Sequence, residues 1–144
     1  MLDEKVFEAI RRKVDNEPYA KKLGLKLRKI DAGYSLIEMT LTPEMDNIFG
    51  TAHGGAIFSL IDEAFETASN SHGTVAVALQ VSISYLKPPL AGSKLFAEAK
   101  EVNRSRSISH YEISVRDDKN DVIATSLCMA YRKKDPLPFL TPGG

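Results

Sequence analysis

Residues 53–71 read HGGAIFSLIDEAFETASNS, and this stretch predicts a long buried helix that begins near two glycines. Its apolar side chains recur at helical spacing, at Ile57, Leu60, Ile61, Ala64, Phe65 and Ala68. Because this apolar stripe is wide, we expect a largely buried helix over about 56–71. His72-Gly73 is predicted to cap its C-terminal end, since glycine readily adopts the left-handed conformation.

Two glycines and one carboxylate make this helix a candidate for chemistry. Gly54-Gly55 let the backbone turn sharply and come close to a bound group. The first turn of a helix leaves backbone N–H groups unpaired, and these can polarise a carbonyl oxygen or bind an anion. Asp62 follows near the middle of the helix, where apolar neighbours such as Phe58 are expected to desolvate it and increase its basicity.

Length and charge restrict the classes of protein to which this chain can belong. The 144 residues, 43% of them apolar, fit a single domain over 1–144. Lysine plus arginine equals aspartate plus glutamate at 19 each, so the net charge suggests neither nucleic-acid binding nor binding to an anionic membrane. We therefore expect a small-molecule site.

The expected compartment is the cytoplasm. We find no apolar stretch of signal-peptide length at the N-terminus and no apolar segment long enough to cross a bilayer. Cys128 is the single cysteine, which excludes an internal disulfide framework. Its alternation with its neighbours in a predicted strand favours a small packing residue over a nucleophile.

The first half of the chain predicts a short amphipathic helix, a hairpin and a loop. Residues 3–16 have helical spacing, and Pro18 is expected to close that pattern. Residues 25–42 are predicted to form two strands around Ala32-Gly33. A loop rich in Asn, Asp and Gly over 43–55 then leads into the long helix.

The second half has the period of β-strands. Apolar residues alternate without a break from Val75 to Tyr85, which predicts a long strand with one buried face. Three further strands are expected after a turn at 88–92, over 94–104, 107–117 and 122–132, followed by a partly disordered tail over 135–144. Strands joined by short turns pair antiparallel, so an α+β fold with the long helix across one sheet is predicted.

These motifs resemble a known family. The pattern Asn47-x-x-Gly50-x-x-His53-Gly54-Gly55, with Asp62 in the following helix and Tyr85-Leu86-Lys87-Pro88 closing the long strand, is similar to that of hotdog-fold acyl-CoA thioesterases of the phenylacetate-degradation type. By element order the resemblance covers about residues 20–132. It implies a hotdog fold, an antiparallel sheet wrapped around a central helix, with homodimers that share a continuous sheet and usually pair into homotetramers.

The resemblance also implies roles for individual residues. Gly54 matches the backbone N–H that polarises the thioester carbonyl, and Asp62 matches a general base or nucleophile. Asn47 and His53 match polar residues that shape and orient the site. The implied reaction is hydrolysis of an aryl, phenylacetyl-like or medium-chain acyl-CoA to the free acid and CoA.

One part of this interpretation follows from helix geometry alone. Asp62 lies eight residues beyond Gly54, about 12 Å further along the helix axis, so the two groups of one chain cannot serve one carbonyl. A second copy of the helix must supply the missing partner. We therefore expect a two-fold homodimer in which each site combines Gly54 of one chain with Asp62 of the other.

The substrate implies further contacts. CoA is anionic, and basic side chains that could meet it are Lys87, Arg104 and Arg106, although each is equally explained as a solvated surface charge. The acyl group is expected in an apolar slot near Gly55 and Phe58. Because CoA is part of the substrate, no separate cofactor is expected.

Histidine spacing argues against a metal. The three histidines, at positions 53, 72 and 110, lack the spacing of metal ligands, so a zinc site is not expected. His110 is interpreted as a strand-surface residue, and Glu63 and Glu66 as solvated or interface charges.

One departure from the family pattern leaves alternatives open. Some members carry Ser or Thr seven residues before the tyrosine, where it assists the attacking water, but this chain has Ala78. Gln80 and Ser82 are expected on the same strand face and are candidates to replace it. A noncatalytic acyl-thioester-binding module and a hotdog dehydratase or hydratase remain alternative functions.

Overall fold

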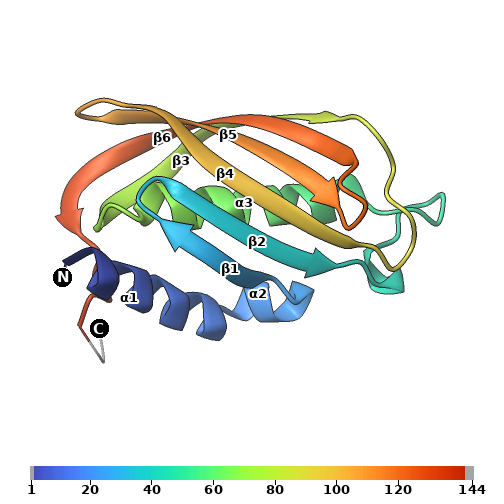
Figure 1. Cartoon of the computed structure of the whole chain (residues 1–144), viewed down its shortest axis with the longest axis horizontal. Helices are drawn as coiled ribbons and strands as arrows, with labels where there is room; N and C mark the ends of the chain where they lie inside the picture. Colours follow the sequence, from blue (N-terminus) through green and yellow to red (C-terminus); the bar gives the residue numbers. More distant parts are fainter. Residues whose placement is uncertain (1, 142–144) are drawn as a thin grey trace.

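The computed structural model describes residues 2–141, which form a six-stranded antiparallel sheet with a long helix against one face (Figure 1). The elements are α1 (Leu2–Asn16), α2 (Pro18–Leu23), β1 (Lys26–Asp31), β2 (Tyr34–Thr40), the 3₁₀ helix η1 (Pro43–Met45), α3 (Gly54–Asn70), β3 (Thr74–Tyr85), β4 (Lys94–Arg104), β5 (Ile108–Asp117) and β6 (Val122–Pro136). The strand order is β1-β2-β4-β5-β6-β3, and α3 contacts every strand. The predicted α+β architecture, a sheet around a central helix, is confirmed.

Helix α3 is the centre of the core. All six apolar residues that predicted it are buried: Ile57, Leu60, Ile61, Ala64, Phe65 and Ala68. It begins at Gly54, two residues earlier than predicted, because His53 caps it. It ends at Asn70 with Ser71 as C-cap, while Gly73 takes the expected left-handed conformation at φ +89°.

His72 is not the predicted cap. Its imidazole Nε2 lies 2.6 Å from the Glu101 carboxylate on β4, and its Nδ1 contacts the Arg104 guanidinium. Tyr111 on β5 donates to the same Glu101 oxygen at 2.8 Å. Because Glu101 and Arg104 bind His72 to β4, and Tyr111 holds Glu101 from β5, His72 anchors the end of the helix to the sheet.

Two helices precede the sheet. The predicted helix over 3–16 is confirmed as α1, but Pro18 does not simply end it. Proline is favoured in the first turn of a helix, where its missing N–H costs no hydrogen bond, and Pro18 begins α2 there. Gly24, at φ +68°, ends α2 and directs the chain into β1. Within residues 2–141, no helix has the length and apolar character needed to cross a bilayer.

Strand β3 lies at an edge of the sheet and differs from the prediction in two ways. It pairs with β6, although only a short connection separates it from β4, and among residues 2–141 no second strand pairs with its other edge. A bulge between Ala78 and Gln80 then reverses the alternation, so that Val77 faces away from α3 whereas Val81 and Ile83 are partly buried against the core. The expected single buried face is therefore wrong for this chain.

The C-terminal segment is more ordered than predicted as far as the structure describes it. Asp135 and Pro136 extend β6, and Leu137 is buried with its N–H donating to the Gly73 carbonyl at 3.0 Å. The rest of the predicted tail, residues 142–144, lies outside the described residues.

Candidate active site

An exposed stripe runs along the otherwise buried helix α3. Its members are Gly55, Phe58, Asp62 and Glu66, which recur at intervals of three and four residues and so lie on one side of the helix. A phenyl ring that is 41% exposed and two carboxylates are unusual on the central helix of a core. The exposed stripe is therefore the part of α3 that can meet a ligand or a second subunit.

The first turn of α3 offers one backbone donor. Within residues 2–141, the N–H of Gly54 has no hydrogen-bond acceptor. The Gly54 carbonyl accepts a 3.0 Å hydrogen bond from the Tyr85 hydroxyl at the end of β3, which fixes this turn against the sheet edge. A Cβ at Gly54 would lie 3.3 Å from the Tyr85 ring, so the absent side chain lets the two approach.

A hydrogen bond joins the side chain of His53 to the backbone of Gly55. The Nδ1 atom of His53 accepts the Gly55 N–H at 2.8 Å, and this bond leaves the proton of a neutral imidazole on Nε2. The Gly55 N–H is thus occupied within the chain, and Gly54 presents the unpaired donor. The His53 N–H donates to the Met45 carbonyl at 2.7 Å, which holds the loop before α3 in place.

Asn47 folds the loop in front of the site. Its side-chain oxygen accepts the N–H groups of Phe49 and Thr51 at 2.9 and 3.1 Å. Its own N–H donates to the Thr51 carbonyl at 2.7 Å. In one chain, Asn47 therefore acts as the turn former that shapes the loop leading to His53.

Helix α3 runs antiparallel to β3, because Gly54 meets Tyr85 at one end and Asn70 accepts the Ala76 N–H at 2.8 Å near the other.

Asp62 lies halfway along α3 on the exposed stripe. Partial desolvation, and secondly the nearby negative charge of Glu66, raise the pKa of the Asp62 carboxyl above its usual value. Such a carboxylate is a better base than one in water.

Within one chain, the donor and the carboxylate remain apart. Gly54 and Asp62 belong to the same uninterrupted helix and are separated by eight residues, which corresponds to about 12 Å along its axis. A reacting carbon must lie within roughly 3 Å of its catalytic groups. A single chain therefore presents the Gly54 donor at one position and the Asp62 carboxylate at another, and neither position has both groups.

Ala78 lies on β3 directly before the bulge, and the bulge changes which residues share its face. Ala78 pairs with Ala130, which is fully buried, so its methyl group faces α3. Beyond the bulge, Ser82 pairs with the exposed Leu127 and lies on the outer face. The expectation that Gln80 and Ser82 share the face of Ala78 is wrong, because the inserted residue reverses the phase.

The basic residues predicted to meet CoA do not lie together. Lys87 follows the end of β3 that meets Gly54, whereas Arg104 and Arg106 lie near the other end of α3. The Lys87 ammonium is 2.6 Å from the Asp121 carboxylate. Arg104 contacts His72 beyond the C-terminal end of α3, at the opposite end of the helix from Gly54. Neither residue joins the Gly54 turn within one chain.

Arg106 belongs to a basic pocket that the sequence did not reveal. The turn between β4 and β5 packs against the end of β6, where Arg132 donates to the Ser105 carbonyl at 2.6 Å. Arg106, Arg132, Lys133 and Lys134 line a cavity of about 340 Å³ there. Arg132 is the last residue of the predicted strand over 122–132, and Lys133 and Lys134 follow it. The pairing of β5 with β6 brings these three residues close to Arg106.

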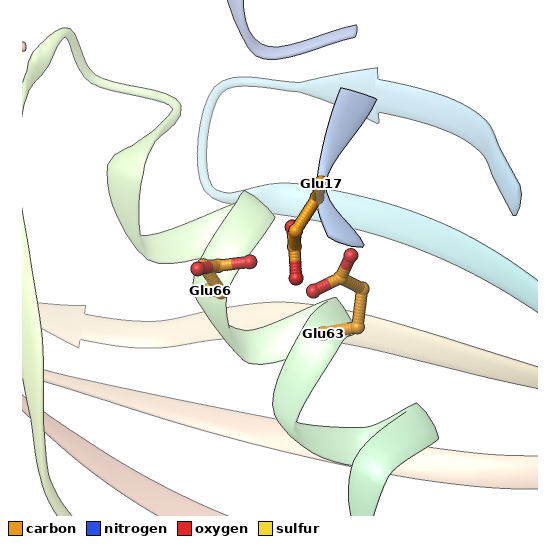
Figure 2. Close-up of side chains that lie close together, drawn as sticks. All are labelled: Glu17, Glu63 and Glu66. Carbon is orange, nitrogen blue, oxygen red and sulfur yellow. The ribbon is translucent and has the colours of Figure 1, made fainter. Parts of the chain in front are cut away.

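Three carboxylates meet beside the exposed stripe (Figure 2). Carboxylate oxygens of Glu17, Glu63 and Glu66 all lie within 4.8 Å of one another. Glu63 is only 4% exposed, so its interpretation as a solvated or interface charge is wrong. Desolvation and the nearby Glu66 raise its pKa to about 10, and the same causes raise that of Glu17 to about 7.

The buried carboxyl predicts a pH-dependent stability. Folding raises the pKa of Glu63 from 4.5 to about 10, so the folded chain holds a proton that the unfolded chain releases between these values. The free energy of unfolding should therefore fall as the pH rises from about 5 to 9, by at most about 1.4 kcal/mol per pH unit for this proton. Glu63→Gln should reduce this pH dependence. Urea unfolding at several pH values, in the presence of a chelator so that no metal binds, measures the free energy of unfolding.

The exposed Glu8 on α1 provides the control for this experiment. Glu8→Gln removes the same charge from a solvated position and should leave the slope unchanged. Equal slopes for wild type and Glu63→Gln would show that Glu63 does not hold the extra proton.

Comparisons with known proteins identify the family. Residues 49–124 match the model of the thioesterase superfamily, and this region contains the Gly54 turn, Asp62 and strands β3 to β5. The fold has a TM-score of 0.89 to the structure of Escherichia coli PaaI from the phenylacetic acid degradation operon, with 31% identity over 94% of this chain and 99% of that one.

Individual relatives agree with this match. The acyl-coenzyme A thioesterase PaaI of Escherichia coli is 36% identical over 76% of this chain and 79% of that protein. An Archaeoglobus fulgidus protein, provisionally named an esterase, is 40% identical over 85% of this chain and 80% of its own length. The Streptococcus mutans protein smu.793, solved with acetyl-CoA, has a TM-score of 0.75 at 26% identity over 78% of this chain and 91% of that one. The chain therefore belongs to the thioesterase superfamily of hotdog enzymes and is PaaI-like within it.

Proposed function

We propose that the protein hydrolyses acyl-CoA thioesters with aryl, phenylacetyl-like or medium-chain acyl groups. The observation that carries this proposal is the pair of groups on α3, the unpaired N–H of Gly54 and the partly desolvated carboxylate of Asp62. The first suits a carbonyl oxygen that gains negative charge, and the second suits the removal of a proton from water. Two observations on similar proteins support CoA as the thiol carrier. The PaaI relative is named an acyl-coenzyme A thioesterase, and smu.793 was solved with acetyl-CoA bound.

In the general-base route, Asp62 takes a proton from a water molecule while the oxygen of that water attacks the thioester carbon. The carbonyl oxygen becomes an oxyanion that accepts a hydrogen bond from the Gly54 N–H. The C–S bond then breaks with its electron pair on sulfur, and CoA leaves as the thiol after taking up the proton. In the nucleophilic route, an Asp62 oxygen attacks the carbon and the C–S bond breaks, so that CoA leaves as the thiolate. Water then hydrolyses the mixed anhydride to the free acid and restores the Asp62 carboxylate.

Each site is proposed to combine two subunits of a homodimer. In the part of the chain that the structure describes, β3 pairs along one edge only, and an unpaired strand edge is a template for a second copy of the same strand. An antiparallel β3–β3 contact would continue the sheet and bring two copies of α3 together, antiparallel, along their exposed stripes. Gly54 of one chain and Asp62 of the other would then meet the same acyl carbon.

An exposed apolar patch on the outer face of the sheet supports pairing of dimers into a homotetramer. Val77 and Tyr131 are paired across β3 and β6 on the sheet face away from α3, and they are 40% and 43% exposed. Leu127, on the same face, is 64% exposed. Such an apolar patch on an outer sheet face favours association with another sheet.

We assign the basic pocket around Arg106 to the phosphates of CoA. Four basic side chains around a 340 Å³ cavity suit phosphate oxygens, which bind guanidinium and ammonium groups through charge-assisted hydrogen bonds. The acyl group is placed near Phe58, which lies on the exposed stripe between Gly54 and Asp62.

Thiol release from a panel of thioesters tests the proposal. Benzoyl-CoA, phenylacetyl-CoA and octanoyl-CoA should include at least one good substrate, and its pantetheine analogue should show a higher KM because it lacks the nucleotide phosphates. Arg106→Gln should raise the KM for the CoA ester and leave that for the pantetheine ester unchanged. Arg11→Gln, an exposed position on α1, is the control.

Two outcomes would overturn the assignment. Tight binding of acyl-CoA with no thiol release would favour a noncatalytic binding module. Addition of water to an enoyl-CoA without thiol release would favour a hydratase.

A further inference from the structure

The carboxylate cluster of Glu17, Glu63 and Glu66 is built from two separate parts of the chain. Glu63 and Glu66 lie one turn apart on α3, and Glu17 comes from the junction between α1 and α2 (Figure 2). Glu17 occupies the N-cap position of α2 but makes no side-chain capping hydrogen bond. Its carboxylate points instead toward that of Glu63.

Glu63 supplies an independent sign of a ligand. Its side chain is more than nine-tenths buried, and its Oε2 atom has no hydrogen-bond partner among the described residues. A buried carboxylate oxygen without a partner is costly, and native structures usually provide a donor or a cation. Figure 2 shows the Glu63 carboxylate facing that of Glu17, which lies between Glu63 and Glu66 in this view.

The charges around the cluster do not neutralise it. Asp62, on the same helix, adds negative charge and is among the causes that raise the pKa of Glu17. Lys13 of α1 lines the adjoining cavity, but its ammonium lies 5.5 Å from the centre of the Phe139 ring, over its face. The cluster therefore gathers three acidic side chains against an apolar core, where they hold protons unless a cation replaces them.

We propose that Glu17, Glu63 and Glu66 bind a hard divalent cation of about the size of Ca²⁺. Ligand oxygens within 4.8 Å of one another fit such an ion, since two oxygens on opposite sides of Ca²⁺ are about 4.6 to 5.2 Å apart. An all-carboxylate set favours Ca²⁺, Mn²⁺ or Mg²⁺ over softer metals. Glu17 and Glu66 also line a cavity of about 600 Å³, through which the ion and its water ligands can enter.

This site does not depend on the proposed thioesterase chemistry, although Glu66 also lies on the exposed stripe that contains Asp62. The expectation that no metal binds rested on the histidines, whereas this cluster contains only glutamates. The cation would replace protons that the cluster otherwise shares, so binding should strengthen as the pH rises from about 6 to 8.

Binding can be measured on the full chain after treatment with a chelator. Millimolar Ca²⁺, Mn²⁺ and Mg²⁺ are added separately, and melting temperature and calorimetric binding are recorded. We expect Ca²⁺ to raise the melting temperature most, with one ion bound per chain. Glu63→Gln, which is of equal size, should lose the shift and the binding heat, whereas the control Glu8→Gln should keep both.

Thioester hydrolysis need not change in this experiment, so a failure here is distinct from a failure of the proposed function. A wild-type protein whose melting temperature and binding heat respond to the three cations no more than those of Glu63→Gln would overturn the proposal. The cluster would then hold only protons. Glu17→Gln provides a second variant, and it should weaken binding while leaving α3 intact.

Discussion

Asp62→Asn is expected to lower kcat for the best acyl-CoA substrate by about 10²–10⁴-fold, the usual contribution of a general base. The amide cannot accept a proton from water or form an anhydride. Folding should be preserved, because Asp62 is exposed and no hydrogen-bond partner of its carboxylate occurs among the described residues. Thiol release at saturating substrate, with gel filtration to confirm the oligomer, measures the effect.

Asp118→Asn is the matched control. Asp118 is an exposed aspartate in the loop between β5 and β6, outside the exposed stripe of α3, and its substitution should leave kcat unchanged. If Asp62→Asn turned over thioesters as fast as wild type, Asp62 would be removed from the mechanism in both of its proposed roles.

The elements of this fold could be predicted from the sequence because each has a strong local period. The helical spacing from Ile57 to Ala68 and the alternation of apolar residues in the later strands predicted α3 and β4 to β6. The pairing of β3 was harder to predict. A strand pairs with whichever edge the packing offers, and here α3 and the sheet leave β3 beside β6 rather than beside β4.

Features that depend on one inserted residue or on contacts between distant parts of the chain could not be predicted from the sequence. The extra residue near Leu79 leaves the apolar alternation intact in the sequence but reverses it in space, which moves Ser82 to the outer face. Glu63 looked like a surface charge because helical spacing alone does not show that Glu17 and α2 cover it. Local periodicity thus predicts elements, whereas burial of a polar residue depends on what packs against it.

The candidate site could be predicted in part for the same reason. Gly54 and Asp62 lie in one continuous motif, so their spacing on a helix follows from the sequence alone. Tyr85 was recognised only as part of a motif, and its hydrogen bond to the Gly54 carbonyl required the β3 edge to lie beside α3. The basic pocket likewise combines a turn residue with the end of another strand.

Gly54→Pro is expected to lower kcat by about 10²–10³-fold, because proline deletes the N–H that would bind the oxyanion. The backbone permits this change. Proline is favoured at the first position of a helix, and His53 before it has ψ +135°, within the range that a following proline requires. Gly54→Ala is the matched control, since it adds the same Cβ against Tyr85 but keeps the N–H. It should retain most of the wild-type kcat.

Mixing the two inactive variants tests whether the site is shared. A dimer of one Gly54→Pro chain and one Asp62→Asn chain has one site with both groups intact and one with neither, if each site combines two subunits. After full exchange of equal amounts, about half of the dimers are mixed, so about a quarter of the wild-type activity should return. If each site used Gly54 and Asp62 of the same chain, every site would carry one defect, and mixing would restore nothing.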